Sequence, residues 1–332
     1  MEETKTLESF AKALADKLKS TMATEYELDV LPEFKFVHKT NGLKPALIIR
    51  IEGCTMPPSL QLQPLYENYL RGTDIDYLAA KMGKEVYNTT KLNPEIPTFS
   101  IEEARRRVRL AMISTKRNED LLKTVPRFEV ADMSAVPKWY ISSDEIGSSS
   151  LFVSKQLAAI MGLTSDEILQ MAHDNTLKQK FEIKSLSDML QESMISEGMP
   201  AEMAKELVPD GIIPAYVVTT EDRLDGASCM LNPKVMEELR QKLTCDHENQ
   251  GVILLPSSRH EIIALAETDD MNPEFLCDMV RQINDSTVSY DDYLSDTIMK
   301  WDGNRLALAF PEPEMETPVV EAPQISMKMG GF

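Results

Sequence analysis

Several features that would tie a protein to a membrane or to the secretory route are missing from this sequence of 332 residues. No run approaches the roughly eighteen consecutive apolar residues that a membrane-spanning helix requires, so we expect no transmembrane segment. The first twenty residues carry acidic side chains where a secretory signal needs basic ones, and their apolar residues are spaced for an amphipathic helix. We therefore expect a soluble protein that stays inside the cell.

Cysteine is scarce, and its placement agrees with that expectation. The four cysteines, Cys54, Cys229, Cys245 and Cys277, stand far apart and form no CxxC pair. A chain of this length can be stable without disulfides, so we interpret them as reduced thiols, mostly buried, in a cytoplasmic protein.

Nucleotide-binding and metal-binding motifs are also missing. None of the 13 glycines belongs to a GxxxxGK[ST] or GxGxxG loop, so a familiar phosphate cradle is excluded. The histidines, His38, His173, His247 and His260, are isolated from one another, and Cys245 with His247 is a single close pair. We predict no metal site and no cofactor.

Basic residues are outnumbered by acidic ones, 35 to 54, which gives a formal net charge of -19 and a pI near 4.7. The mean field of such a protein repels phosphates and anionic lipid headgroups, so neither nucleic acid nor a membrane is an expected partner. The same acidity leaves open that the protein mimics nucleic acid and binds a nucleic-acid-binding protein.

One basic run stands out against this acidity. We interpret this run as a solvated helix face that pairs with Glu102 and Glu103. The alternative is a binding site for an anion or a partner. Arg223 is a further binding candidate, because a pocket lined by it, His260 and Asp225 would indicate a functional site. The run consists of Arg105, Arg106, Arg107 and Arg109, followed by Lys116 and Arg117.

Apolar spacing and cap residues predict the helices. Capping boxes begin at Ser100 and Thr164, and the Asn-Pro pairs at Asn232 and Asn272 place a cap before a proline suited to the first helical position. The predicted helices are 4–19, 65–70, 73–86, 154–161, 164–175, two short surface helices within 186–204, and those that follow Asn232 and Asn272.

Runs of β-branched and aromatic residues predict the strands. Residues 105–112 stay ambiguous, because Val108, Leu110 and Met112 alternate as in a strand while the arginines suit a helix surface. The predicted strands are 26–37 and 45–52 joined by a turn at 39–42, then 128–141, 151–153, 216–219, 251–255 and 261–266 as a hairpin, and 297–301 and 306–310 as another.

These elements predict an α+β fold of mainly antiparallel sheets with helices packed on one face. Length favours two globular parts. We predict a helix-plus-hairpin subdomain at 1–125, an α+β domain at 126–310, and a disordered acidic tail of Pro and Glu at 311–332.

The most chemical-looking cluster is Ser257, Ser258, His260 and Glu261, which invites a serine-type hydrolase as an alternative function. Neighbours in a strand point to opposite faces, so His260 and Glu261 do not share one site without a bulge. No GxSxG elbow accompanies the serines. Turn chemistry is the favoured interpretation of this cluster.

Five segments carry a resemblance to a known family: Val125-Pro-Arg-Phe128, residues 151–168, Ala227-Ser-Cys-Met-Leu-Asn-Pro233, Leu255-Pro-Ser-Ser-Arg-His-Glu261 and Leu294-Ser-Asp296. Through these segments the second half resembles a domain-of-unknown-function family from anaerobic Firmicutes, many of them gut bacteria, and it is also similar to YtpQ-type bacterial proteins. That resemblance implies a bacterial cytoplasmic protein encoded on mobile elements, and it brings no catalytic residue with it.

Taken together, these features favour a non-enzymatic binding or accessory protein whose partner is another protein. The serine hydrolase and the acidic mimic remain the alternatives, and the sequence leaves the oligomeric state open.

Overall fold

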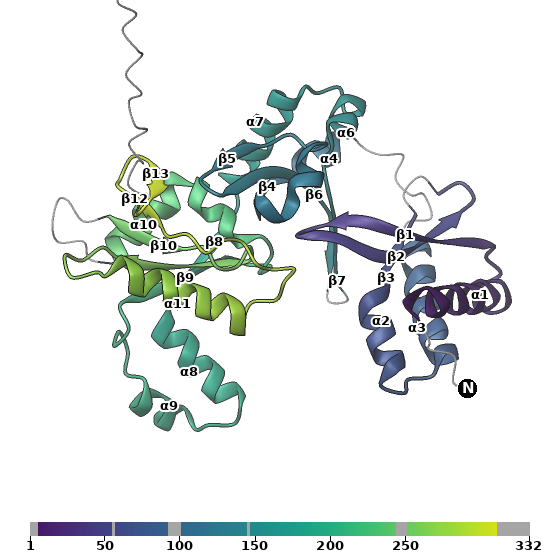
Figure 1. Ribbon diagram of the computed structural model, residues 1–332, viewed down its shortest axis with the longest axis horizontal. Coiled ribbons are helices and arrows are strands. Elements are labelled where there is room, and N and C mark those ends of the chain that lie inside the picture. The colour runs from purple at the N-terminus through teal and green to yellow at the C-terminus, as the bar shows by residue number, and fades with distance from the viewer. Residues whose placement is uncertain (1–5, 55–56, 92–100, 145–146, 244–250, 311–332) are drawn as a thin grey trace, which may run out of the picture.

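The structure is a computed structural model, and it describes residues 6–54, 57–91, 101–144, 147–243 and 251–310. The predicted tail at 311–332 lies outside the described residues, as do Cys245, His247 and the predicted cap Ser100. The predicted α+β class is confirmed: three antiparallel sheets follow one another along the chain, each with its own helices (Figure 1).

The first sheet has helices on one face, as predicted. It joins β1 (Val30–Lys39), β2 (Gly42–Ile51) and β3 (Ser59–Gln61), and is covered by α1 (Leu7–Glu25), α2 (Leu62–Leu70) and α3 (Ile75–Lys91). These elements share a core that includes Leu14, Leu18, Leu47 and Ile49. The turn of the β1–β2 hairpin reaches the middle of the molecule (Figure 1).

The middle sheet resolves the ambiguous segment. Helix α4 (Ile101–Arg107) stops where β4 (Val108–Ser114) begins, because β4 is buried on both faces, with Leu110 and Met112 in one core and Ala111 and Ile113 in another. The long strand β6 (Met133–Asp144) pairs with β4, with β5 (Phe128–Val130) and with β7 (Gly147–Phe152). The predicted β-type runs at 128–141 thus belong to two strands, β5 and β6, and Ala131 takes a positive φ in the turn between them.

Short helices surround the middle sheet. These are η1 (Lys116–Asn118), α5 (Glu119–Leu122), α6 (Lys155–Ile160) and α7 (Ser165–Thr176). The predicted capping box at the start of α7 is confirmed, since Thr164 accepts from the Glu167 amide and the Glu167 carboxylate accepts from the Thr164 amide.

The third sheet contains six antiparallel strands in the order β13-β12-β10-β11-β9-β8. Both predicted hairpins are confirmed by the pairing of β10 with β11 and of β12 with β13. The strands are β8 (Phe181–Ser185), β9 (Ala215–Thr220), β10 (Val252–Leu255), β11 (Glu261–Ala266), β12 (Met299–Trp301) and β13 (Leu306–Leu308).

Helices cover both faces of this third sheet, which differs from the predicted one-face arrangement. Val252 and Leu254 of β10 share a core with α10 (Pro233–Lys242), whereas Ile253 and Leu255 point the other way and pack with α11 (Pro273–Ser286). A strand that is buried on both faces has apolar residues at successive positions. The run of four apolar residues in β10 is too short to predict whether helices cover one face of the sheet or both. The predicted Asn caps of both helices are confirmed.

Three further elements complete this part of the chain: α8 (Leu186–Ser196), α9 (Ala201–Leu207) and the 3₁₀ helix η2 (Gly226–Leu231). The largest core draws residues from α4 through β12, while residues between 10 and 86 form a core of their own. The predicted boundary near residue 126 therefore lies inside the middle sheet, between β4 and β5. None of the helices in the described ranges could cross a membrane by length and hydropathy.

Candidate functional site

The loop between β10 and β11 carries the predicted candidates Ser257, Ser258 and His260. Its backbone is held in place, since the amides of Leu294 and Ser295 donate to the carbonyl oxygens of Ser257 and Pro256. Both serines are buried, and the Ser258 hydroxyl accepts a hydrogen bond from the backbone N–H of His260 at 3.1 Å. The serine thus contacts the histidine backbone.

The imidazole of His260 is occupied on both of its nitrogens. Its Nδ1 accepts from the backbone N–H of Asp225 at 3.2 Å, which requires the ring proton to sit on Nε2. Nε2 then donates to the carboxylate of Asp292 at 3.0 Å. A general base for a serine nucleophile needs a ring nitrogen against the hydroxyl, and this ring has neither nitrogen to offer. The Glu261 side chain is exposed to solvent instead.

Beneath His260 lies a charged group that we name the Asp225 cluster, formed by Asp225, Lys138, Tyr140, Arg259 and Asp292. The Asp225 carboxylate, only 2% exposed, accepts from the Lys138 ammonium at 2.7 Å and from the Tyr140 hydroxyl at 2.6 Å. Its second oxygen accepts from the Arg259 guanidinium at 2.5 Å. Arg259 also contacts Asp292 at 3.3 Å, so one arginine links a buried carboxylate to a half-exposed one.

Burial and charge oppose each other in this cluster. Burial favours the protonated Asp225 carboxyl, but the charges of Lys138 and Arg259 outweigh burial and hold its pKa well below the usual range. Burial lowers the pKa of the Lys138 ammonium, although Asp225 opposes that shift. Burial and the neighbouring carboxylate both raise the pKa of the Tyr140 phenol. The cluster is a closed ion-pair network around one carboxylate.

Local backbone geometry explains how Asp225 reaches this place. Asp225 and Arg223 both have positive φ, in a turn where the Thr220 hydroxyl accepts from the Leu224 amide and donates to its carbonyl oxygen. Gly226 follows because the backbone passes close to β11: a Cβ there would lie 2.3 Å from the carbonyl oxygen of His260. Aspartate tolerates the left-handed conformation better than most residues, so an Asp-Gly pair suits the turn.

The basic run at 105–109 does not form one surface patch. Arg106 and Arg107 pair with Glu102 and Glu103 one turn earlier, as the i,i+4 spacing predicts. Arg105 turns inward and donates to the carbonyl oxygen of Met161 at 2.8 Å. Arg109, on β4, stacks over the Tyr140 ring at 4.0 Å and contacts Asp222 at 3.5 Å. Arg223 is exposed and takes part in none of these contacts.

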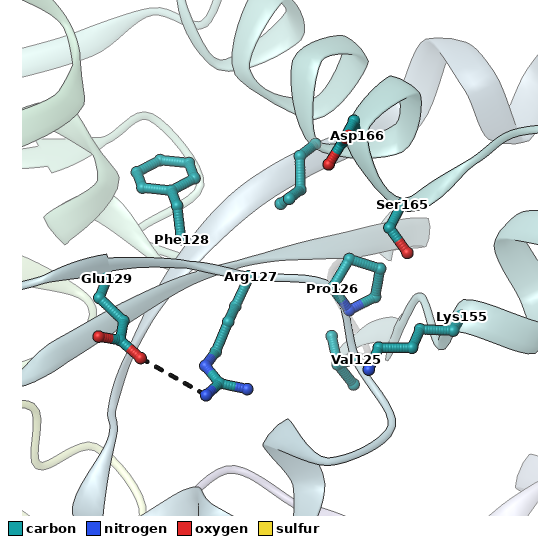
Figure 2. A pocket seen from close by; sticks show the side chains of 9 residues that line it. Val125, Pro126, Arg127, Phe128, Glu129, Lys155, Ser165 and Asp166 are labelled. Carbon is teal, nitrogen blue, oxygen red and sulfur yellow. Dashed lines mark hydrogen bonds and ion pairs between the residues drawn. The ribbon is translucent and has the colours of Figure 1, made fainter.

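A surface depression lies on the middle sheet, away from all the predicted site residues. Its volume is about 570 Å³ and it is widely open to solvent. Figure 2 shows the segment 125–129 along it, with Lys155 and the start of α7 on its other side. Arg127 and Lys155 are balanced by Glu129 and Asp166, and Arg127 turns toward Glu129 at 3.4 Å. The depression therefore favours neither sign of charge.

The helices α8 and α9 form a second candidate surface, which we name the helical projection (residues 186–213). It extends from the third sheet between β8 and β9 (Figure 1). Within the two helices only Ser187 and Ala204 are buried. Among the described residues, 14 large hydrophobic side chains are exposed, and five of them lie on this short segment, so the apolar exposure is concentrated there: Leu190, Ile195, Met203, Leu207 and Ile212.

The projection is held in shape by its own polar contacts. The Gln191 amide donates to the carbonyl oxygen of Val208 at 2.7 Å and to Asp210 at 3.0 Å. Lys205 pairs with Asp210 at 2.6 Å, and the Ile213 amide donates to the Ser187 hydroxyl at 3.3 Å. The two helices thus present their apolar residues from a fixed arrangement.

Sequence reasoning missed most of the Asp225 cluster. Lys138 and Tyr140 lie in a strand recognised only by its apolar neighbours, and their partner is more than 80 residues away in the chain. The signals that could have found them are a lysine inside an apolar run and the Asp-Gly pair after β9. Within the described ranges, no group of three or more His, Cys, Asp or Glu side chains could hold a metal ion.

The comparison with protein families gives one match. The model of the family of unknown function DUF5688 matches residues 7–302, so the chain belongs to the DUF5688 family. Neither the curated proteins nor the solved structures contain a significant match to this chain.

Proposed function

We propose that this member of the DUF5688 family is a non-enzymatic accessory protein that binds another protein through the helical projection. The observation that carries the proposal is the concentration of exposed apolar residues on α8, on α9 and on the segment that follows α9. Leu207 and Ile212 are 60% and 61% exposed. Clustered apolar exposure on a folded monomer is typical of an interaction surface, whereas single exposed residues are common everywhere.

Charge indicates what kind of partner fits. Six carboxylates and one lysine give residues 186–213 a formal charge of -5. A second copy of the same surface, or an anionic membrane, would meet this charge with its own negative charge. The partner we propose is therefore a protein whose apolar groove is rimmed by Lys and Arg. A nucleic-acid-binding protein is one such partner, and in that case the acidic mimic is the correct description.

The remaining alternative, the serine hydrolase, receives less support from the site. Its proposed base, His260, uses Nδ1 and Nε2 on Asp225 and Asp292. We also propose a cytoplasmic, bacterial protein, as the resemblance implies. The free state of Cys54, Cys229 and Cys277 supports the cytoplasm as its location.

The test is capture from a lysate of the source cells with the immobilised full-length protein. We compare wild type, the double variant Leu207→Ser with Ile212→Ser, and Phe275→Ser as a control. Phe275 is 67% exposed on α11, so it matches the hydrophobic change at another place. All three changes are at the surface and leave the cores intact.

The expected result is a basic protein that wild type and Phe275→Ser capture alike and that the double variant loses. Its affinity should fall at least about tenfold in the double variant, since a few apolar anchors dominate most interfaces. Binding should also weaken with added salt. Equal capture by the double variant, or a captured protein that is acidic, would refute the proposal.

A further inference from the structure

Strand β1 forms one edge of the first sheet. It pairs with β2 over 10 residues, from Val30 opposite Ile51 to Lys39 opposite Gly42, and with no other strand in the described part of the chain. The turn that ends it is anchored, since the Asn41 backbone N–H donates to the side chain of Asn118 at 2.7 Å. The first sheet therefore has a long edge strand that is held in place and has one unpaired side.

The direction of the backbone groups of β1 can be followed from β2. The Ile49 N–H donates to the carbonyl oxygen of Pro58, so it points away from β1. In an antiparallel ladder the residue opposite Ile49, which is Pro32, likewise directs its backbone away from β2. Every second residue of β1 shares this outward direction: Val30, Pro32, Phe34, Phe36 and His38.

These outward groups are free in the described structure. No hydrogen bond between described residues uses the backbone N–H or carbonyl oxygen of any of the five. Proline has no N–H, so Pro32 removes a single donor from the row. The open side of β1 can therefore form a second ladder.

Apolar side chains are exposed along this edge. Leu31 is 54% exposed and Phe36 is 56% exposed, and they stand on opposite faces of the strand. A long edge strand with exposed apolar residues is a template for pairing with another strand, and prolines or charges usually prevent such pairing. Here the charged residues between the two apolar ones, Glu33 and Lys35, have opposite signs.

We infer that the open edge of β1 pairs with β1 of a second copy of this chain, antiparallel and with Phe34 on the two-fold axis. The two first sheets would then form one continuous sheet. Because residues directly opposite each other lie on the same face, the helix layers of both copies would cover the same face of that sheet. This interface is separate from the helical projection and goes beyond the proposed function.

The side chains of β1 complement themselves in this register. Glu33 lies opposite Lys35 of the second copy, and the two-fold axis repeats the contact, so two ion pairs form across the axis. Exposed apolar residues also gain apolar partners on both faces. The opposed pairs are Leu31 with Val37, Pro32 with Phe36, Glu33 with Lys35, and Phe34 with Phe34.

Charge separates this register from its neighbours. If the axis passes through Lys35, two lysines lie directly opposite each other, and if it passes through Glu33, two glutamates do. Like charges directly opposite each other destabilise a ladder. A partner of another sequence would need a lysine and a glutamate in the complementary order, and β1 carries that order itself. The strand therefore fits a second copy of itself.

The test is sedimentation equilibrium of the full-length protein from about 1 to 100 µM, in about 0.15 M salt, which screens the distant acidic charges. The variants are Lys35→Glu and Glu33→Lys, each of which places like charges opposite each other. The double variant exchanges the two residues. Lys180→Glu is the control for the change of charge, because Lys180 is 81% exposed and lies before β8 in another sheet.

Wild type and Lys180→Glu should approach twice the chain mass of 37.4 kDa as the concentration rises. Each single variant should dissociate at concentrations at least about tenfold higher. An equal mixture of the two single variants should associate again, because a chain with two acidic residues at 33 and 35 then faces a chain with two basic ones. The double variant should associate as wild type does. Both recoveries show that the single variants fold.

Three results would overturn the inference: a wild type that keeps the mass of one chain, single variants that associate as wild type does, or a mixture that stays dissociated. The double variant of the helical projection, Leu207→Ser with Ile212→Ser, should associate as wild type does. Failure of this interface and failure of the proposed function are therefore distinguishable.

Discussion

Replacing Asp225 by Asn tests whether the Asp225 cluster depends on one buried charge. Asn tolerates the left-handed conformation of this position as Asp does, so the backbone is not perturbed. Arg259 keeps Asp292 as a partner, but Lys138 loses its ion pair and stays buried. Breaking one half of a buried ion pair costs about 3–5 kcal/mol, and we expect a loss of that size.

The loss has an upper limit that depends on pH. Lys138 can lose its proton in the folded variant, which costs about 1.4 kcal/mol for each pH unit below the usual lysine pKa of about 10.4. At pH 7 this cost is about 5 kcal/mol, which is the largest loss of stability that the unpaired charge can cause. In Asp225→Asn the unfolded state then binds more protons than the folded state, so stability rises with pH. The difference in free energy of unfolding between wild type and Asp225→Asn should therefore decrease by about 2–3 kcal/mol from pH 7 to pH 9.

The assay is urea unfolding at both pH values, with Asp222→Asn as the control. Asp222 makes a 3.5 Å contact with Arg109 near the surface, and its replacement should cost less than about 1 kcal/mol. Adding Lys138→Met to Asp225→Asn should restore most of the lost stability, because no unpaired charge is left. A loss of under about 1 kcal/mol in Asp225→Asn, or no recovery in the double variant, would refute the reasoning.

Two further predictions concern the same region. Gly226→Ala should lower the free energy of unfolding in urea by more than about 2 kcal/mol, because its Cβ would lie 2.3 Å from the His260 carbonyl oxygen and 2.8 Å from the Thr219 Cα. The control, Gly198→Ala, has open space but a φ of 99°, so it should cost only about 1 kcal/mol. Equal losses in the two variants would contradict the clash at Gly226. The hydrogen bond from His260 is the main cause that lowers the pKa of Asp292, to about 2. The stability that the Asp292 carboxylate contributes is therefore complete above about pH 4 and is lost as the pH falls toward 2. The difference in urea midpoint between wild type and Asp292→Asn should shrink across that window, and a constant difference would show that the carboxylate contributes nothing.

Much of the secondary structure could be predicted because its causes are local. The capping box of Thr164 and Glu167 and the Asn-Pro start at Asn232 act within three residues, and each formed as expected. The first helix was predicted to end at Lys19 but continues to Glu25, because Met22 packs into the core beside α3. The two hairpins of the third sheet were likewise readable from their turns.

The sequence by itself determined the elements, the α+β class and the overall acidity, since these depend on composition and on neighbours along the chain. Tertiary structure decided the rest. Lys138 is an ordinary strand residue until Asp225, 87 positions later, is brought to its ammonium. The energetic effect of a buried charge depends on partners that only folding brings together. The low polarity of the interior makes each pairing, or its absence, energetically large.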